Sequence, residues 1–185
     1  MTDTENALQP DLDARARRAI RDIADFPKAG IVFKDITPLL SDGELFAATT
    51  AAMAQPFADS KITHVVAVES RGFILGAPVS QRLRAGFIPM RKPGKLPAPT
   101  ESEVYALEYG TDSLEIHADA CNWKEHPRIL IVDDVLATGG TADAACRLVE
   151  RLGGEVVGLS FLLSLRFLSG LERLRGRELR TLLTY

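Results

Sequence analysis

The sequence has few of the residues that mark several large classes of protein. Only two of its 185 residues are cysteines, and neither Cys121 nor Cys146 belongs to a CxxC pair, which argues against a zinc site or a disulfide framework and favours free thiols. Basic residues are not in excess, because 22 Lys and Arg stand against 25 Asp and Glu and give a net charge of -3. A chain without that excess lacks the charge that drives nucleic-acid binding. The composition predicts one globular domain with no nucleic-acid partner.

Long hydrophobic runs and two common nucleotide motifs are missing as well. The longest apolar stretch, residues 156–165, is interrupted by Gly and Ser and is about half of the ~20 residues that a membrane helix needs. Residues 1–18 are polar and have no apolar segment of a secretory signal, so we expect a cytoplasmic protein with no membrane partner. Neither GxxxxGK[ST] nor GxGxxG occurs, which excludes the usual P-loop and dinucleotide fingerprints.

The N-terminal part is predicted to contain two helices with an irregular segment between them. Apolar residues recur at helical spacing over residues 12–23, with arginines between them, which indicates an amphipathic helix. Proline and glycine interrupt residues 26–38, and we expect irregular structure there. The pattern Ser-Asp-Gly-Glu at residues 41–44 resembles a capping box and predicts a helix of roughly 12–14 residues that ends near Pro56.

The rest of the chain alternates between strand and helix patterns. Residues 64–68 and 87–90 are strand-like and flank a helical pattern over residues 72–83. Residues 128–133 and 155–163 form a second such pair of strands around another helix. Apolar strands without alternation are typical of parallel sheets covered on both faces. The sequence therefore predicts an α/β fold with a central, mostly parallel sheet and helices on both faces.

Two further segments are predicted to project from this sheet. Residues 105–108 and 114–117 flank a turn-forming sequence and indicate a β-hairpin. Before it, Arg91, Lys92 and Lys95 lie among prolines and glycine in a loop that we do not expect to pack into the core. Such a loop suits a lid that closes on an anion, and the alternative is a solvated basic loop.

The strongest chemical signal follows the strand at residues 128–133. Asp133 and Asp134 precede Val-Leu-Ala-Thr-Gly-Gly-Thr, which leads directly into a helix. Glycines let the backbone close around an anion, and the helix N-terminus favours negative charge. The two carboxylates suit hydrogen bonds from sugar hydroxyls or a contact to Mg²⁺. This segment predicts a sugar-phosphate site, and the alternative is a glycine-rich turn that merely joins strand to helix.

These residues carry a resemblance to a known family. Residues 131–141 resemble the phosphoribosyl pyrophosphate motif of the type I phosphoribosyltransferases. Three more segments narrow the resemblance to the adenine phosphoribosyltransferase family: residues 26–38 are similar to its base-binding hood, residues 69–73 to its pyrophosphate loop, and residues 91–110 to its flexible loop. The resemblance implies the type I phosphoribosyltransferase fold as a single domain over residues 1–185, with an N-terminal helix and hood in residues 1–40.

The resemblance also implies an activity. The family transfers the phosphoribosyl group of 5-phospho-α-D-ribose 1-diphosphate to adenine and releases AMP and diphosphate, a pentosyl transfer in purine salvage. It implies Mg²⁺ as cofactor, held mainly by the substrate with Asp133 and Asp134 as further candidates, and a homodimer. Two alternatives remain open: a transferase for hypoxanthine, guanine or xanthine, and a non-catalytic regulator that senses phosphoribosyl pyrophosphate.

Residue roles are carried over position by position. Arg71 and Glu108 are the candidate catalytic residues, and Tyr109 in the flexible loop or a water is the alternative proton acceptor to Glu108. The resemblance also implies a cis peptide bond between Ser70 and Arg71. The candidate binding residues are, for ribose 5-phosphate, Asp133, Asp134, Ala137, Thr138, Gly139, Gly140 and Thr141; for diphosphate, Glu69, Ser70, Arg71, Gly72, Arg91, Lys92 and Lys95; and for adenine, Val32, Phe33, Lys34 and Leu165.

Taken without the resemblance, some of these residues have plainer interpretations. Phe33 and Leu165 suit a hydrophobic core, Arg71 suits an exposed helix start, and Glu108 suits a solvated hairpin. The sequence also departs from some family members near its C-terminus, where Ser164 and Leu171 replace an acidic residue and an arginine. Contacts made by those two side chains are therefore not carried over.

Overall fold

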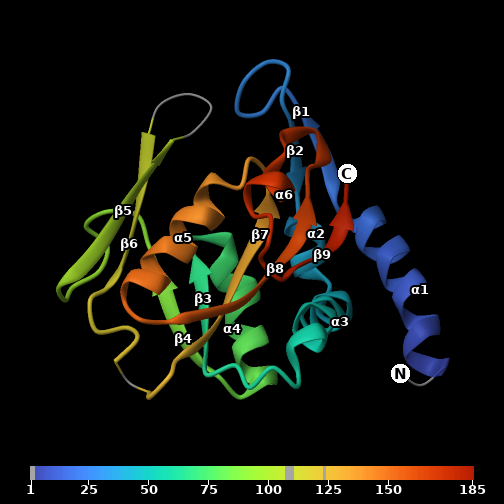
Figure 1. The fold of residues 1–185 in the computed structure, drawn as a ribbon. Coiled ribbons are helices and arrows are strands. Elements are labelled where there is room, and N and C mark those ends of the chain that lie inside the picture. Colours follow the sequence, from blue (N-terminus) through green and yellow to red (C-terminus); the bar gives the residue numbers. More distant parts are fainter. Residues whose placement is uncertain (1–2, 107–110, 123) are drawn as a thin grey trace. The chain divides into compact units, whose positions relative to one another are not determined.

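The computed structural model describes residues 3–106, 111–122 and 124–185 (Figure 1). The chain divides into two compact units, Met1–Ala52 and Met53–Tyr185. In the described part of the chain, no helix combines the length and the apolar character needed to cross a bilayer.

The second unit is built on a five-stranded sheet. Each pairing between neighbouring strands is parallel. The strands lie side by side in the order β4 (Gly86–Met90), β3 (His64–Val68), β7 (Arg128–Leu136), β8 (Glu155–Ser164) and β9 (Leu179–Thr184). The predicted strands are confirmed with small shifts of their ends, whereas β9 was not predicted.

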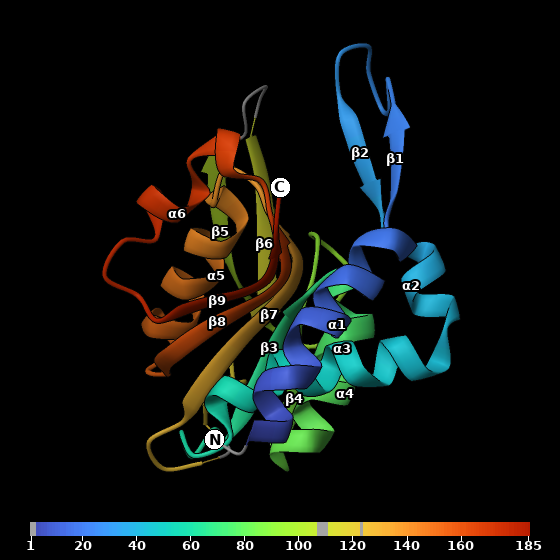
Figure 2. The same ribbon diagram turned by 90° about the vertical axis from the view of Figure 1, so that its right-hand side faces the viewer.

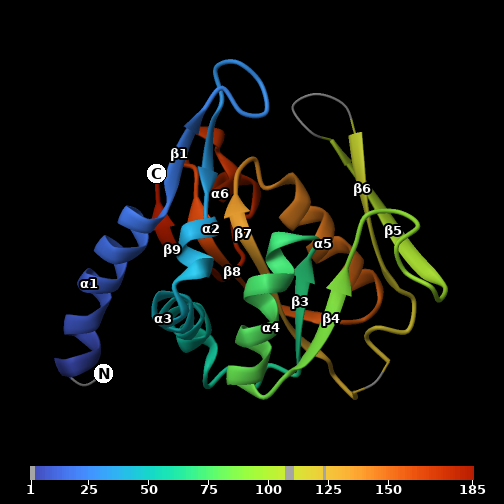
Figure 3. The ribbon, with the colours of Figure 1, turned by 180° about the vertical axis from the view of Figure 1, so that it is seen from behind.

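Helices cover both faces of this sheet, as the apolar strand pattern predicts. Helix α5 (Gly140–Arg151) lies on one face (Figure 1), and α4 (Arg71–Leu83) lies on the other (Figure 3). Four consecutive residues of β7, Ile129 to Val132, are fully buried. Because successive side chains of a strand point to opposite faces, this burial requires a cover on both sides. The prediction of an α/β fold with a parallel central sheet is confirmed.

A two-stranded hairpin and three short helices complete the second unit. Strands β5 (Thr100–Ala106) and β6 (Thr111–His117) pair antiparallel beside α5 (Figure 1). The hairpin is confirmed, but its strands begin earlier than predicted, at Thr100 and Thr111. Seven backbone pairs join them, and this pairing does not depend on the pattern of side chains that the prediction used. Its tip, residues 107–110, lies outside the described residues. The short helices are η1 (Gln55–Phe57), η2 (Arg166–Leu168) and α6 (Gly170–Arg173).

The first unit contains three helices and a hairpin. Helix α1 (Asp3–Ala19) is followed by strands β1 (Arg21–Ala24) and β2 (Val32–Asp35), which pair antiparallel and project beyond the end of α1 (Figure 2). One residue separates β2 from α2 (Thr37–Ser41), and one separates α2 from α3 (Gly43–Ala54), whose last two residues belong to the second unit.

Three details of the predicted first unit are wrong. The first helix ends at Ala19, so the helical spacing that continues to Ile23 is coincidental and Ile23 lies in β1. Residues 26–38 are not irregular throughout, because β2 gains its hydrogen bonds from β1. The cap of α3 comes from Asp42, whose Oδ1 accepts the Leu45 backbone N–H at 3.0 Å, rather than from Ser41.

Candidate functional site

The candidate site forms where two neighbouring strands end. Strands β3 and β7 are parallel and adjacent, so their carboxyl ends lie at the same edge of the sheet. The loop after β3 leads into α4 at Arg71, and the loop after β7 leads into α5 at Gly140. The fold therefore brings together the pyrophosphate-loop and sugar-phosphate segments, which are far apart in sequence.

The predicted sugar-phosphate segment wraps around a small pocket. The pocket has a volume of about 60 Å³ and lies at the N-terminus of α5. Gly139 adopts a left-handed conformation with φ of 77°, which a residue with a side chain rarely takes. The residues that line the pocket are Asp133, Val135, Leu136, Ala137, Thr138, Gly139, Gly140, Thr141, Ala142 and Phe161. All the predicted residues of this segment except Asp134 are among them.

Gly170 supports this loop from behind and was missed in the sequence analysis. A Cβ on Gly170 would lie 2.2 Å from the carbonyl oxygen of Ala137 and 3.0 Å from the backbone nitrogen of Gly139. Both neighbours are backbone atoms, which cannot move aside as a side chain can. We call residues 137–141 the phosphate loop, after their predicted role. Gly170 lets the start of α6 approach this loop closely, and no local sequence pattern around residue 170 signals that approach.

Two carboxylates lie beside the loop. The side chain of Asp134 is 7% exposed, and Asp133 Oδ1 accepts the backbone N–H of Asp134 at 2.9 Å. Burial raises the pKa of Asp133 well above its ordinary value, and repulsion from Asp134 adds to the rise. Burial also raises the pKa of Asp134, and the guanidinium of Arg71 opposes that rise. Ionisation of the acid pair therefore costs free energy, as expected of groups that serve a ligand.

The segment similar to the pyrophosphate loop, residues 69–73, contacts the acid pair directly. Arg71 Nε lies 2.6 Å from Asp134 Oδ2. A Cβ on Gly72 would lie 2.8 Å from Asp133 Oδ1, so glycine is needed for this approach. The cis peptide bond joins Glu69 to Ser70, and the prediction of a cis bond after Ser70 is wrong by one position. The residue pattern identifies the turn but does not distinguish its two consecutive peptide bonds.

Glu69 holds the start of the basic loop at residues 91–95, which we call the cationic loop. Its carboxylate accepts hydrogen bonds from Arg91 Nε and Nη2, both at 3.1 Å, and from the Lys92 backbone N–H at 3.0 Å. The hydrogen bonds from Arg91 keep the pKa of Glu69 below its usual range. Arg91 Nη1 also donates to the carbonyl oxygen of Lys95 at 3.0 Å. Glu69 therefore positions Arg91, a role that the sequence pattern did not indicate.

Lys92 is tied to the β5–β6 hairpin. Its Nζ donates to Asp112 Oδ2 and, at 3.2 Å, to Tyr105 Oη, and the Tyr105 hydroxyl donates to Asp112 at 3.1 Å. Burial favours the neutral amine, but these hydrogen bonds outweigh it and raise the pKa of Lys92. Lys95 is exposed. Sequence reasoning missed Tyr105 and Asp112, because their pairing with Lys92 depends on the register of the hairpin.

The predicted adenine-binding residues come from both units. In the first unit, Phe33 on β2 makes an edge-to-face contact with Phe26, with ring centroids 5.2 Å apart, and Val32 is 51% exposed. Lys34 Nζ lies 2.6 Å from Asp22 Oδ1. In the second unit, Leu165 follows β8, and its backbone N–H donates to the Leu136 carbonyl at 2.9 Å, next to the phosphate loop.

Two predicted residues fall outside the structural description. Glu108 and Tyr109 belong to the segment 107–110 and lie outside the described residues. Their roles stay predictions.

Within the parts of the chain that are described, no group of three or more His, Cys, Asp or Glu side chains is arranged to hold a metal ion. Cys121 and Cys146 are free, as predicted, and the structure shows that both are buried.

Comparisons with known proteins agree with this geometry. The model of the phosphoribosyl transferase domain family matches residues 37–173. An adenine phosphoribosyltransferase of Myxococcus xanthus is 57% identical over 182 residues, which cover 98% of this chain and 96% of the relative. A crystal structure of adenine phosphoribosyltransferase from Rhodothermus marinus is 50% identical, has a TM-score of 0.90, and aligns over 95% of this chain and 99% of its own.

A more distant solved structure shows ligands. The adenine phosphoribosyltransferase of Saccharomyces cerevisiae, in complex with adenine and an imino-altritol bisphosphate, is 34% identical with a TM-score of 0.87. The alignment covers 94% of this chain and 99% of the yeast chain.

Proposed function

The chain belongs to the adenine phosphoribosyltransferase family, and we propose that the loops after β3 and β7 carry out the transfer that defines this family. The reaction joins adenine to 5-phospho-α-D-ribose 1-diphosphate and gives AMP and diphosphate. The observation that carries the proposal is the 2.6 Å contact between Arg71 Nε and Asp134 Oδ2, which joins the start of α4 to the end of β7 at one sheet edge. A sugar held in the second loop then has its reacting carbon next to the first.

The work of the protein in this reaction is mainly electrostatic. As the bond from C1 to the diphosphate oxygen breaks, negative charge grows on the leaving diphosphate and positive charge on the ribose. We assign the 5-phosphate to residues 137–141 and the ribose hydroxyls to Asp133 and Asp134. Arg71 stabilises the departing diphosphate, together with the cationic loop at residues 91–95.

Mg²⁺ fits this arrangement as a partner of the substrate rather than of a protein cage. The candidate protein ligands beside the pocket, Asp133 and Asp134, are two carboxylates, and oxygen is the ligand that Mg²⁺ prefers. Mg²⁺ usually keeps few protein ligands and binds phosphate oxygens. When bound, it would neutralise charge on the diphosphate.

We assign the base to Val32, Phe33, Lys34 and Leu165. The aromatic ring of Phe33 is suited to stacking against a purine, and the backbone of β2 can read its edge. Adenine offers a donor at N6 and an acceptor at N1, whereas 6-oxopurines reverse both. A fixed backbone carbonyl and N–H therefore cannot pair with a 6-oxopurine. Each polar group left unpaired costs about 1–3 kcal/mol, so two such groups favour adenine over a 6-oxopurine by about 10²-fold or more. Glu108 is proposed to accept the N9 proton.

One assay tests this function against its alternatives. The protein is incubated with phosphoribosyl pyrophosphate, Mg²⁺ and each purine base in turn, and nucleotide formation is followed. We expect AMP from adenine, at least about 10²-fold faster than any product from hypoxanthine, guanine or xanthine. A preference for another base would identify a different purine transferase. No product from any base, with phosphoribosyl pyrophosphate still bound, would identify a sensor.

We further propose that the protein is a cytoplasmic homodimer. Exposed apolar side chains on α4 and on the edge strand β4, Ile74 at 43% and Phe87 at 37% exposure, support self-association. Sedimentation of the purified protein tests the oligomeric state, and a monomer at assay concentrations would contradict it.

A further inference from the structure

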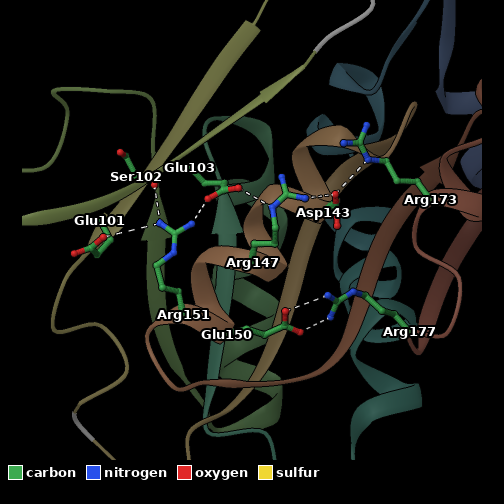
Figure 4. Close-up of polar contacts among 9 residues, drawn as sticks. All are labelled: Glu101, Ser102, Glu103, Asp143, Arg147, Glu150, Arg151, Arg173 and Arg177. Atoms are coloured by element: carbon green, nitrogen blue, oxygen red, sulfur yellow. Dashed lines mark hydrogen bonds and ion pairs between the residues drawn. The ribbon is translucent and has the colours of Figure 1, made fainter.

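An ion-pair network runs along the outer face of α5 and joins three parts of the second unit (Figure 4). Glu103 on β5 accepts hydrogen bonds from Arg147 Nε at 2.6 Å and from Arg151 Nη2. Arg147 also donates to Asp143 on the same helix. Asp143 Oδ2 lies 3.3 Å from Arg173 Nε on α6. We call these five residues the α5 network.

The α5 network lies beside the phosphate loop. Asp143 is in the first turn of α5, and its backbone N–H donates to the Gly139 carbonyl at 2.9 Å. Arg173 belongs to α6, whose first residue, Gly170, lies against the backbone of Ala137 and Gly139. The network therefore connects the hairpin that follows the cationic loop with both helices that support the phosphate pocket.

The charge of Asp143 gives this connection a chemical consequence. A carboxylate in the first turn of a helix interacts favourably with the helix dipole, but it also repels an anion bound at that helix end. Arg147 and Arg173 neutralise Asp143, whose side chain is 20% exposed. On the hairpin, the Glu103 side chain is 16% exposed, and its hydrogen bond from Arg147 lowers its pKa. Linked pairs of this kind hold their geometry better than an isolated surface pair.

We infer that Arg147 is a positioning residue for the sugar diphosphate: it fixes the middle of strand β5 against α5 and neutralises Asp143 beside the phosphate loop. This inference rests on the proposed function. It predicts that loss of Arg147 weakens binding of the anionic substrate selectively, because adenine carries no charge to be repelled and is assigned to other elements.

The same helix provides a matched control. Arg177 donates to both carboxylate oxygens of Glu150, at 2.6 Å and 3.2 Å, and so ties α5 to the segment before β9. Figure 4 shows this pair apart from the chain of contacts that leads to Glu103. Arg177→Met removes an arginine that pairs with a carboxylate of the same helix, and it breaks none of the hydrogen bonds that reach the hairpin or Asp143.

The test compares steady-state kinetics of Arg147→Met, Arg147→Lys and Arg177→Met. We expect Arg147→Met to raise KM for phosphoribosyl pyrophosphate about fivefold, which is about 1 kcal/mol at 1.4 kcal/mol per tenfold. KM for adenine and kcat should stay within about twofold. Arg147→Lys should recover most of the loss, and Arg177→Met should match the wild type. Hydrogen exchange of β5 and β6 should be faster in Arg147→Met alone.

Equal values of KM for phosphoribosyl pyrophosphate in Arg147→Met and Arg177→Met would overturn the inference. If Arg147→Met does not fold, Glu103→Gln decides, because it removes the charge that Arg147 contacts while keeping the shape. We expect the same selective rise, and an unchanged KM would overturn the inference. If these variants match a wild type that makes AMP, the proposed function stands and only the role of Arg147 fails. A wild type that makes no nucleotide would remove both.

Discussion

Arg71 Nε and Asp134 Oδ2 lie 2.6 Å apart, although one residue starts the helix after β3 and the other lies within β7. The contact pairs the arginine assigned to the leaving diphosphate with a carboxylate assigned to the ribose. Because Arg71 is partly exposed and Asp134 is nearly buried, the arginine can reach a ligand while it still compensates the buried charge. The start of α4 and the end of β7 are therefore linked by an electrostatic contact as well as by the sheet.

Removal of this arginine should affect turnover strongly. We expect Arg71→Ala to lower kcat by about 10²–10³, by analogy with the loss of a donor to a developing anion. Single-turnover kinetics with saturating substrates measure the effect. Arg82, in the last turn of the same helix, provides the control, since Arg82→Ala should leave kcat unchanged. A decrease of less than about fivefold for Arg71→Ala would contradict its assignment.

Substitution of Asp133 should separate stability from binding. The pKa of this carboxyl is raised in the folded protein, so its ionisation destabilises the fold above the unfolded pKa of 3.8. Asp133→Asn keeps an acceptor for the Asp134 N–H and removes the charge. We expect the melting temperature at pH 7 to rise by about 2–4 °C, which is about 1 kcal/mol for a protein of this size, while affinity for AMP falls.

The stability gained in Asp133→Asn should depend on pH. As the pH falls below the unfolded pKa of 3.8, residue 133 loses its charge in the folded and the unfolded wild type and has none in Asp133→Asn, so the gain in stability should disappear there. Urea unfolding of the wild type and of Asp133→Asn measures this difference in stability. The range from pH 3.5 to pH 7 is suitable because it extends to both sides of the unfolded pKa of 3.8. A stability difference that stays constant over this range would show that charge is not its cause.

Gly170→Ala should damage the phosphate loop from a residue that does not line it. The added methyl group would lie 2.2 Å from the Ala137 carbonyl oxygen, so the loop must shift. A displacement of about 1 Å in a binding site costs about 10²-fold in rate, and we expect a loss of that order in kcat/KM for phosphoribosyl pyrophosphate. Gly43→Ala is the matched control, because nothing lies within 4 Å of its added carbon. Equal activity of the two variants would contradict the supporting role of Gly170.

Asp35 should stabilise the first unit only above strongly acidic pH. Hydrogen bonds from the side chain and backbone of Thr37 and from Arg21 lower the pKa of Asp35 from 3.8 to about 2. A lowered carboxyl pKa contributes stability that is complete above the unfolded pKa and is lost as the pH falls through the folded one. The titration midpoint of the Asp35 carboxyl, followed by NMR, should move upward in Thr37→Ala. An unchanged midpoint would exclude the Thr37 hydroxyl as a cause.

Much of the candidate site could be predicted because its residues are contiguous. The apolar strand at residues 128–133, its acidic pair and the following Thr-Gly-Gly-Thr form one local signal, and the structure places a pocket there. The ends of helices and strands were predicted less accurately. The end of α1 at Ala19 and the strand pairing of β2 depend on hydrogen bonds between residues that the local pattern does not connect.

The sequence by itself determined the alternation of strands and helices between residues 64 and 163, the burial of the central sheet on both faces and the glycine-rich loop that leads from β7 into α5, since each depends on the spacing of nearby residues. Only the tertiary structure decided which distant groups meet: Gly170 behind Ala137, Glu69 on Arg91, and Asp112 on Lys92. The physical reason is that these contacts depend on strand register and on the close approach of separate backbone segments. Residue type and spacing along the chain do not encode either one locally.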